Sequence, residues 1–272
     1  MRGLVVLSSL CRLAAGLTIP TQPEKRAVAA GFAIYSCTQE GTIALTFDDG
    51  PFVYTDSVLD QLAAAGFKAT FFLNGYNIGN IADYASTVNR MIDEGHQVAS
   101  HTYGHPDLAG LDDFDVEQQM SLLSNEFSNM IGKYPTYMRP PYFSFSDRTL
   151  AVMGRLGYKV IIADIDTDDW RYSSFGGVEL SIESYTGGLN NGGSIVLMHD
   201  VHQNTVQNIL PRIIQATRRS GKKAVTVGEC LGDPETNWYR SGGSRPTEWN
   251  RTESQSTPVV QTPIPEILAN GE

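Results

Sequence analysis

Two adjacent carboxylates and a pair of histidines further along the chain carry the clearest chemical signal in the sequence. Asp48 and Asp49 end an apolar run and precede a Gly-Pro pair. His101 and His105 lie one helical turn apart, so both imidazoles can face one ion. One carboxylate and two imidazoles make the ligand set of a catalytic zinc site, which keeps a position open for water. The sequence therefore predicts a metal-dependent hydrolase.

The second carboxylate is expected to act beside the metal. Successive strand residues point to opposite faces, but a turn at the Gly-Pro pair can bring Asp48 and Asp49 into one site. A bound cation and a nearby arginine can keep both ionised, so that one binds the metal while the other serves as a base. Ser100 and Thr102 are expected to support the histidine rings. The alternative is a solvated acidic turn beside ordinary core or surface histidines.

A further histidine, His199, ends an apolar run and is suited to act as a general acid. Such an acid needs a carboxylate that orients its ring. Aspartates at positions 164, 166, 168 and 169 are available, and Asp169, before Trp170, is the first choice. On the sequence alone His202 competes with His199, whereas His96 is interpreted as structural.

The elements that must position these residues can be read from the alternation of apolar runs with segments of helical periodicity. The predicted strands cover residues 42–47, 69–73, 97–100, 137–139, 159–163, 194–198 and 223–227. The predicted helices cover residues 56–65, 86–94, 115–131, 148–156, 182–189 and 205–218. Strands that alternate with helices in this way predict a mostly parallel sheet covered by helices.

The predicted fold is therefore α/β, a distorted (β/α) barrel of about seven parallel strands. In such barrels the active site lies at the C-terminal ends of the strands. Every polar candidate lies at or after the end of a predicted strand: Asp48, Asp49, His101, Arg139, Asp169 and His199. This shared placement is stronger support for one site than any single motif.

Length and charge limit the classes of function. The 272 residues suffice for one α/β domain with tails. A formal net charge of −10 does not favour binding to nucleic acid or to an anionic membrane surface. The sequence has no uncharged apolar run of roughly eighteen residues, so no transmembrane helix is expected. We expect a monomer that binds neither nucleic acid nor membrane.

The two ends of the chain differ in composition from its centre. Residues 1–26 resemble a secretory signal with a dibasic processing site, and a disordered apolar tail is the alternative. Residues 27–240 are predicted to be the catalytic domain, and residues 241–272 a disordered tail rich in Ser, Thr and Pro. Asn250 begins an N-glycosylation sequence there, and the alternative is that this sequence is not glycosylated. We expect a secreted protein, extracellular or in the cell wall.

Two of the three cysteines are expected to be paired. Cys11 would leave with the signal segment, while Cys37 and Cys230 flank the predicted strands. In an oxidising compartment a disulfide between them would tie the two ends of the domain together. Two buried free thiols are the alternative.

The chain resembles the polysaccharide deacetylases of carbohydrate esterase family four. All five sequence motifs of that family occur in order: residues 46–49 (TFDD), 101–105 (HTYGH), 139–142 (RPPY), 166–170 (DTDDW) and 197–199 (LMH). Around them, residues 69–75, 95–101 and 229–234 are closest to fungal chitin deacetylases. No motif position is broken, so an active enzyme is expected.

The resemblance implies a role for each residue of the metal site. Asp49, His101 and His105 would bind zinc, with Co²⁺ or another divalent metal as alternatives. Asp48 would be the general base that deprotonates the attacking water. Arg139 would pair with Asp48 and hold it ionised.

The remaining motif residues are implied to act on the substrate. The backbone N–H of Tyr142 would donate to the oxyanion. His199 would protonate the departing amine, with Asp169 orienting its ring. Trp170 and Leu197 would form apolar walls around the acetyl methyl group.

The implied reaction is hydrolysis of the N-acetyl group of N-acetylglucosamine residues in chitin or chitooligosaccharides, which releases acetate and leaves chitosan. An acetylxylan esterase and a peptidoglycan deacetylase are the alternative enzymes. A non-catalytic chitin-binding protein is disfavoured because Asp48 and His199 are both present. An aspartyl-phosphate phosphatase is disfavoured because its motif requires Thr where Asp168 stands.

Overall fold

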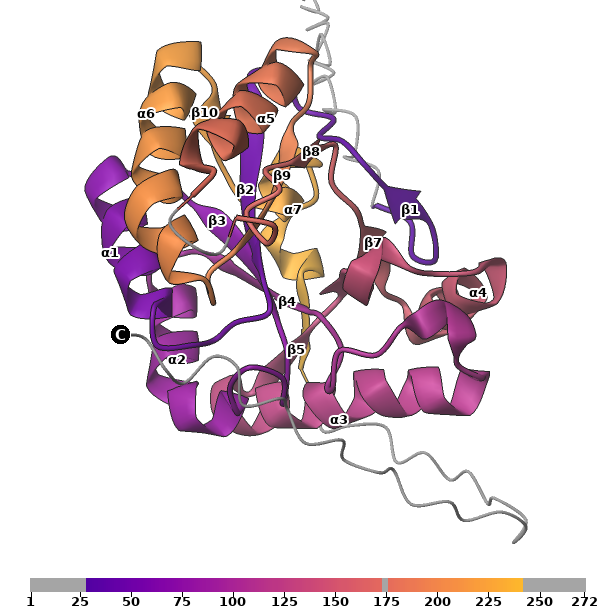
Figure 1. The fold of residues 1–272 in the computed structure, drawn as a ribbon. Helices are drawn as coiled ribbons and strands as arrows, with labels where there is room; N and C mark the ends of the chain where they lie inside the picture. Colours follow the sequence, from indigo (N-terminus) through magenta and orange to yellow (C-terminus); the bar gives the residue numbers. More distant parts are fainter. Residues whose placement is uncertain (1–27, 173–175, 242–272) are drawn as a thin grey trace, which may run out of the picture.

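A sheet of parallel strands lies at the centre of the molecule, with helices around its outside (Figure 1). The computed structural model describes residues 28–172 and 176–241. The predicted signal segment, Cys11, the predicted tail beyond Ser241 and the glycosylation candidate Asn250 lie outside the described residues.

Within the described ranges nine strands form this sheet, and all of their pairings are parallel. Their order is β1 (Ala33–Ile34), β7 (Lys159–Ile161), β6 (Tyr137–Met138), β4 (Gln97–Ser100), β3 (Ala69–Leu73), β2 (Thr42–Asp48), β9 (Ile195–His199) and β8 (Ile165–Asp166), and β10 (Lys223–Ala224) also pairs with β2. In the described part of the chain the two edge strands, β1 and β8, do not pair with each other, so the curled sheet forms an open, distorted barrel. The predicted α/β barrel class is confirmed.

A second, two-stranded sheet lies outside this barrel. It pairs β5 (Lys133–Pro135) with β11 (Tyr239–Ser241) in antiparallel fashion. The pairing brings the end of the described chain back onto the segment that follows α3.

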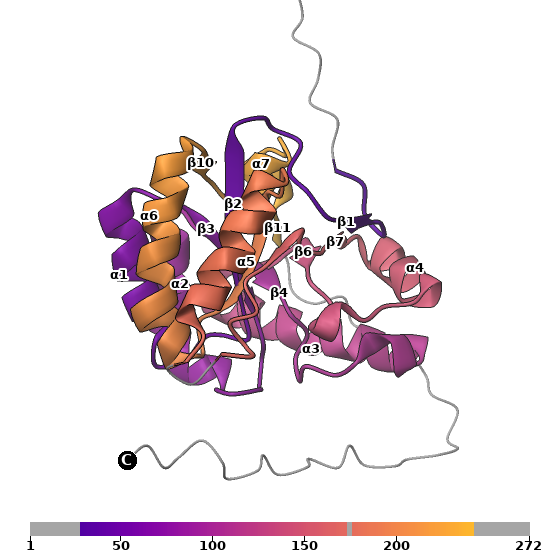
Figure 2. The same cartoon turned by 45° about the horizontal axis from the view of Figure 1, so that its top comes forward.

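The connections between the strands are mostly helical. The α-helices are α1 (Thr55–Ala65), α2 (Ala85–Asp93), α3 (Asp113–Ile131), α4 (Asp147–Leu156), α5 (Val178–Asn190), α6 (Leu210–Ser220) and α7 (Val227–Cys230). Short 3-10 helices cover Ile81–Tyr84, Leu108–Gly110, Pro141–Phe143 and Glu235–Asn237. The helices α5, α6 and α1 pack side by side on one flank of the sheet (Figure 2). In the described ranges no helix combines the length and apolarity needed to cross a membrane.

Local sequence signals explain where these helices begin. The Asp112 side chain accepts a hydrogen bond from the backbone of Asp115 and caps α3. Ser146 and Thr149 form a reciprocal capping box at the start of α4. These caps satisfy backbone donors that a helix start leaves unpaired.

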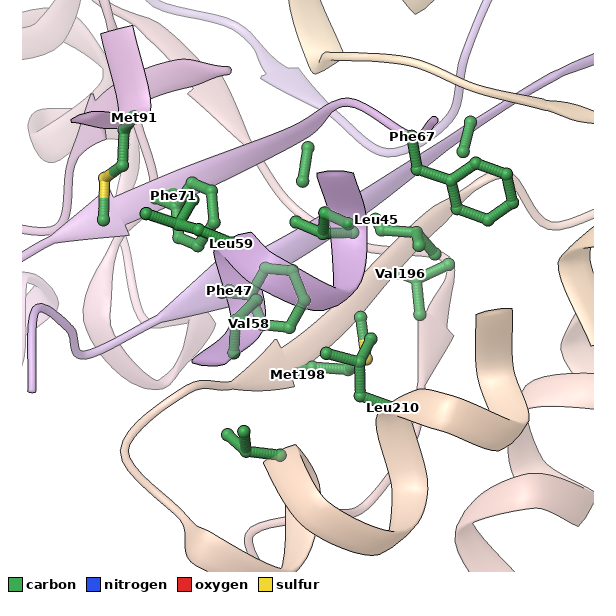
Figure 3. Close-up of a cluster of buried hydrophobic side chains, with 14 of the residues drawn as sticks. Leu45, Phe47, Val58, Leu59, Phe67, Phe71, Met91, Val196, Met198 and Leu210 are labelled. Atoms are coloured by element: carbon green, nitrogen blue, oxygen red, sulfur yellow. The ribbon is translucent and has the colours of Figure 1, made fainter. Parts of the chain in front are cut away.

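The main core lies between the sheet and the α1–α6 flank. Leu45 and Phe47 of β2 are fully buried and meet Leu59 of α1, Met198 of β9 and Leu210 of α6 (Figure 3). Burying an apolar side chain of this size contributes roughly 1.5–3 kcal/mol. Because β2 is covered on both faces, its sequence is a nearly continuous apolar run. The strand lies at the centre of the sheet, paired with β3, β9 and β10.

Several predicted elements differ from the structure: the helix expected over 182–189 covers Val178–Asn190, and the strand expected over 159–163 ends at Ile161. The segment 205–218 begins as a π-helix, Thr205–Ile209, before α6. The last strand was expected over 223–227 but ends at Ala224, because Thr226 caps the short helix α7 through the backbone of Glu229. The strands β1, β5, β8 and β11 were not predicted, since two or three residues show no periodicity.

The predicted disulfide is confirmed. Cys37, before β2, is bonded to Cys230 in α7. The bond closes a loop across 193 positions of sequence and joins the two ends of the barrel segment. In the chain-entropy model such a loop stabilises the fold by up to about 5 kcal/mol.

Candidate active site

Strand register brings the candidate residues to one end of the sheet. Asp48, the last residue of β2, pairs with His199, the last residue of β9. Ser100 and Met138 pair at the ends of β4 and β6, so His101 and Arg139 each follow a strand end. These ends surround a cavity of about 460 Å³. Its lining residues are Asp48, Asp49, His101, His105, Pro140, Tyr142, Phe143, Asp166, Trp170, Leu197, His199 and His202.

Asp49 leaves the strand through a turn that aims its carboxylate at the two histidines. Its φ of 73° lies in the left-handed region, which is uncommon outside glycine. One carboxylate oxygen, Oδ1, lies 3.7 Å from Nε2 of His101 and 3.1 Å from Nε2 of His105. A tetrahedral centre with bonds of about 2.0–2.1 Å holds its ligand atoms about 3.3 Å apart. The donor set therefore fits a small divalent cation.

The His101 ring is held with the correct nitrogen free. Its Nδ1 donates a hydrogen bond of 2.8 Å to the carbonyl of Arg139, which can only accept. The lone pair is then on Nε2, which faces Asp49. Burial lowers the pKa of His101, against the opposing charges of Asp48 and Asp49. The ring is thus prepared as a neutral metal ligand.

The His105 ring contacts an exposed tyrosine. Its Nδ1 lies 3.1 Å from the hydroxyl of Tyr142, and the two rings meet edge to face. Burial opposes the charge of Asp49, but the hydrogen bond from His105 and the nearby imidazoles lower the pKa of this carboxyl below its ordinary value. The carboxylate is therefore ionised.

The expectation that Ser100 and Thr102 support the rings was wrong, because each accepts a backbone N–H instead.

Asp48 lies beside this set in a buried ion pair. The Arg139 guanidinium, with no exposed surface, donates to Asp48 Oδ1 at 2.7 Å and to the Thr46 hydroxyl at 2.7 Å. It also donates to the carbonyls of Ile161 and Ile162. Because the guanidinium hydrogen bonds are satisfied, the pair is held in one geometry despite its desolvation.

His199, which lines the same cavity, forms a second pair with the buried Asp169. The imidazole Nδ1 lies 2.8 Å from Asp169 Oδ1, and the backbone N–H of His199 donates to Oδ2 at 2.7 Å. The Thr205 hydroxyl donates to the same Oδ2. Burial opposes the charged imidazole, but Asp169, with Asp49 and Asp48, outweighs it and raises the pKa of His199 to about 10. At neutral pH the ring therefore carries a proton that it can donate.

The other aspartates considered as partners of His199, and the histidine interpreted as structural, make different contacts. Asp164 accepts the backbone N–H groups of Ser194 and Ile195 at the start of β9. Asp168 forms an ion pair on the surface with Arg171. His96 is buried in the core, where it accepts a backbone N–H, as expected for a structural histidine.

The predicted apolar walls both line the cavity. Leu197 is nearly buried, whereas the Trp170 side chain is about half exposed at the rim. Tyr142, also at the rim, is 70% exposed. Asp166 and His202 line the cavity as well, so His202 is a neighbour of His199.

Sequence reasoning missed several residues that hold the site together. Thr46 and Thr205 support the two ion pairs; Thr46 begins the first motif but was given no role, and no local pattern marks Thr205. Asn77 donates to Asp49 Oδ1 at 3.3 Å, and Asn74 binds the carbonyls of His101 and Thr102. Asn74 could have been found, because it directly follows β3 and so obeys the same strand-end rule.

Comparison with known proteins identifies the family. A family model described as polysaccharide deacetylase matches residues 35–161. The chain is 49% identical over 224 residues to a chitin deacetylase of Pestalotiopsis sp, which covers 82% of this chain and 75% of that protein. The chain belongs to the polysaccharide deacetylase family.

Two other family members are similar over most of the chain. A probable peptidoglycan-N-acetylglucosamine deacetylase of Arthroderma benhamiae is 49% identical over 78% of this chain, which spans 48% of that protein. The solved structure of the chitin deacetylase from Colletotrichum lindemuthianum superposes with a TM-score of 0.77 at 42% identity, covering 79% of this chain and 98% of that one. The open barrel is thus the fold of a solved polysaccharide deacetylase.

Proposed function

We propose that this polysaccharide deacetylase hydrolyses the N-acetyl group of N-acetylglucosamine residues in chitin or chitooligosaccharides. One observation supports the chemistry above all others: a buried carboxylate, Asp48, and an imidazole, His199, line one cavity from paired strand ends together with a metal-ligand set. A base and an acid around a metal are what amide hydrolysis requires. The names of the relatives from Pestalotiopsis and Colletotrichum support chitin as the substrate.

Asp49, His101 and His105 would hold the metal, and we propose zinc. Two imidazole nitrogens and one carboxylate oxygen form a donor set typical of catalytic zinc. When bound, zinc supplies a Lewis acid that polarises the acetamide carbonyl and makes water acidic near neutral pH.

Asp48 would take the proton of the attacking water. Its Oδ1 is occupied by Arg139, while Oδ2 lies 3.8 Å from Nε2 of His101 and so faces the metal-ligand set. The fixed guanidinium keeps this oxygen pointed at the place where the water must be. A positioned base of this kind contributes roughly 10²–10⁴-fold to the rate.

The backbone N–H of Tyr142 would stabilise the oxyanion. In the described part of the chain this N–H makes no hydrogen bond, and the residue has a φ of 58°. A donor prearranged for a developing negative charge contributes roughly 3 kcal/mol. The strained backbone would therefore serve to present the N–H toward the cavity.

His199 would complete the reaction by protonating the amine nitrogen as its bond to the carbonyl carbon breaks. Asp169 holds Nδ1, which leaves Nε2 for the substrate. The carbon keeps the oxygen of the attacking water, so the products are acetate and a free amino sugar. Trp170 and Leu197 would enclose the acetyl methyl group.

The same site supports a second substrate. The Arthroderma relative is named for peptidoglycan at an identity equal to that of the Pestalotiopsis chitin deacetylase. An acetylxylan esterase would use the same metal, base and oxyanion donor. A binding protein without activity has no need of both the Asp48–Arg139 and His199–Asp169 pairs.

We further propose that the protein is secreted and acts as a monomer on its glycan. The disulfide between Cys37 and Cys230 supports an oxidising compartment, because such bonds rarely persist in the cytosol. The acidic charge of the chain suits a neutral polymer that becomes cationic on deacetylation.

The test is acetate release by the chain from Ala27 onward, assayed on a chitin pentamer, on peptidoglycan and on acetylxylan. We expect release from the pentamer that a chelator abolishes and zinc restores. Release only from acetylxylan or only from peptidoglycan would keep the metal site and overturn the substrate. No release from any of them by a folded, zinc-loaded protein would contradict the enzymatic proposal.

A further inference from the structure

Asp200 is a buried carboxyl beside the site that the proposed reaction does not use. It directly follows His199 and has no exposed surface. Its Oδ2 accepts a hydrogen bond of 2.5 Å from the Thr55 hydroxyl, while Oδ1 has no hydrogen-bond partner among the described residues. A buried polar atom without a partner costs free energy. Stability alone therefore does not explain an aspartate at this position.

The carboxyl is packed against the turn that follows the two catalytic carboxylates. A Cβ built on Gly50 would lie 2.5 Å from each carboxyl oxygen of Asp200. Only glycine fits between Asp49 and Pro51 while the carboxyl is in place. The backbone of the turn and the Asp200 side chain therefore determine each other's position.

Thr55 connects the same carboxyl to the far side of the turn. Its hydroxyl donates to Asp200 and accepts the backbone N–H of Phe52 at 2.9 Å. The backbone N–H of Thr55 in turn donates to the carbonyl of Phe52. A hydroxyl has one proton, so the acceptor Asp200 directs a Thr55 lone pair toward the turn.

The turn needs this support because Asp49 is strained. A non-glycine residue in the left-handed region costs roughly 1 kcal/mol and persists only where neighbours hold it. From the β3 side, the backbone N–H of Asn74 donates to the carbonyl of Gly50 at 3.0 Å. Two further contacts to the turn come from Asp200, which follows β9, and from Thr55, which begins α1.

We propose that Asp200 is a positioning residue that, through Thr55 and Gly50, holds the Asp49 carboxylate where it can bind the metal with His101 and His105. The inference rests on the proposed function in one respect, namely that these three residues are a metal site. Asp200 is neither one of the residues that line the cavity nor a member of the metal-ligand set. Its role is to fix the backbone from which one ligand projects.

The first test compares two substitutions of Thr55 in the full chain. Thr55→Val keeps the branched shape but removes the hydroxyl, whereas Thr55→Ser keeps the hydroxyl. Zinc affinity of the metal-free protein is measured by calorimetric titration with zinc alone, and folding by the thermal midpoint. We expect Thr55→Val to bind zinc roughly tenfold or more weakly, and Thr55→Ser to remain within about threefold of the parent. A parental affinity in Thr55→Val would overturn the proposal.

The second test separates positioning from space filling. Gly50→Ala introduces a methyl group against the carboxyl, and Asp200→Ala makes room for it. If Asp200 only fills space, the double variant Gly50→Ala/Asp200→Ala recovers parental zinc affinity, and the proposal fails. If Asp200 positions the turn, the double variant and Asp200→Ala both stay roughly tenfold weaker.

Zinc affinity is measured without substrate, so this test and that of the function fail differently. Parental protein that binds zinc but releases no acetate contradicts the proposed reaction. The role of Asp200 is then still tested by comparing the zinc affinities of the variants with that of the parent. Parental protein that binds no zinc contradicts the metal site and the role of Asp200 together. Where an alanine variant does not fold, the Thr55 pair decides.

Discussion

The two ends of the parallel sheet turn the chain by different means. At the ends where helices lead back into strands, the left-handed positions after α1, α3, α4 and α6 are glycines: Gly66, Gly132, Gly157 and Gly221. At the end that holds the cavity, Gly177 before α5 is also left-handed, but six left-handed positions are occupied by residues with side chains: Asp49, Thr102, His105, Tyr142, Phe143 and Asp168. Glycine adopts this conformation without steric cost, and other residues do not.

Backbone strain from left-handed residues other than glycine is therefore found at the cavity end of the sheet. Residues in left-handed conformations at the cavity include two metal-ligand candidates and the proposed oxyanion donor. Their side chains or amides are needed in directions that an ordinary turn does not offer. The opposite end carries the disulfide and the buried Lys159–Asp233 pair, and it serves to hold the barrel together. Catalysis and stability thus draw on different ends, as is usual in barrel enzymes.

The sharpest way to break this comparison is to remove one buried carboxylate charge at each end. Asp48→Asn keeps the shape but removes the proposed base beside Arg139. We expect kcat for acetate release to fall roughly 10²–10⁴-fold, because a positioned base contributes that much. The thermal midpoint should fall as well, because the fully buried Arg139 loses its charged partner, so kcat is measured on protein shown to be folded.

The matched variant at the other end is Asp233→Asn, which removes the carboxylate beside Lys159 and Tyr137. We expect the free energy of unfolding to fall by roughly 3 kcal/mol, since a buried cation loses its partner. The kcat of the folded protein should change little. A large loss of kcat in Asp233→Asn with normal folding would show that the two ends are not separate.

Removing the disulfide extends the same comparison. The double variant Cys37→Ser/Cys230→Ser should lower the free energy of unfolding by about 2–5 kcal/mol, because the unfolded chain regains the freedom of the long loop. Denaturant unfolding under oxidising conditions measures this loss. Activity below the unfolding transition should remain parental, since both cysteines lie away from the cavity. An active site that fails before unfolding would contradict the division.

At the catalytic end, Asp169→Asn should change how the unfolding free energy and kcat depend on pH. The pKa of His199 is raised to about 10 when folded, against an ordinary value of 6.5. The folded state therefore keeps a proton that the unfolded chain loses between these values. The stabilisation is complete below pH 6.5 and is lost as the pH rises toward 10.

Two measurements follow from this sign. In metal-free protein the difference in unfolding free energy between the parent and Asp169→Asn should shrink as the pH rises through that window. The alkaline limb of the kcat profile of the zinc enzyme should also move to lower pH in Asp169→Asn, because His199 loses its proton more easily. An unmoved limb would remove His199 as the acid.

The smallest effect is expected at a glycine of the stabilising end. Gly132→Ala places a side chain in the left-handed turn after α3, where no atom lies within contact distance of the new Cβ. We expect a loss of about 1 kcal/mol in unfolding free energy and no change in kcat. Gly132→Asn should lose less, because asparagine tolerates this conformation better. Equal losses would mean that backbone conformation is not the cause.

Much of the fold could be predicted because long apolar runs carry periodic information. The strands Ala69–Leu73 and Gln97–Ser100 match their predicted bounds. Strands of two or three residues, such as Ala33–Ile34, owe their existence to a neighbour and leave no such pattern. Helical periodicity likewise does not distinguish the π-helix at Thr205–Ile209 from the α-helix that follows it.

The site could be predicted where chemistry coincides with a strand end. Asp49, His101 and His105 have reactive side chains and follow strands, so their meeting was foreseeable. Thr55 and Asp200 are separated by 145 positions, and a hydroxyl at a helix start has many ordinary explanations. Such supporting contacts depend on three-dimensional packing and not on local pattern.

The bond between Cys37 and Cys230 also bears on damage to the backbone. All helices from α1 to α6 and all strands from β2 to β10 lie between the two cysteines. A protease that cuts one peptide bond in this span leaves two fragments that are still one molecule. Their separation and return are then intramolecular events with a high effective concentration. A nicked chain would therefore tend to keep its cavity assembled, whereas the same cut without the bond would release half of the site.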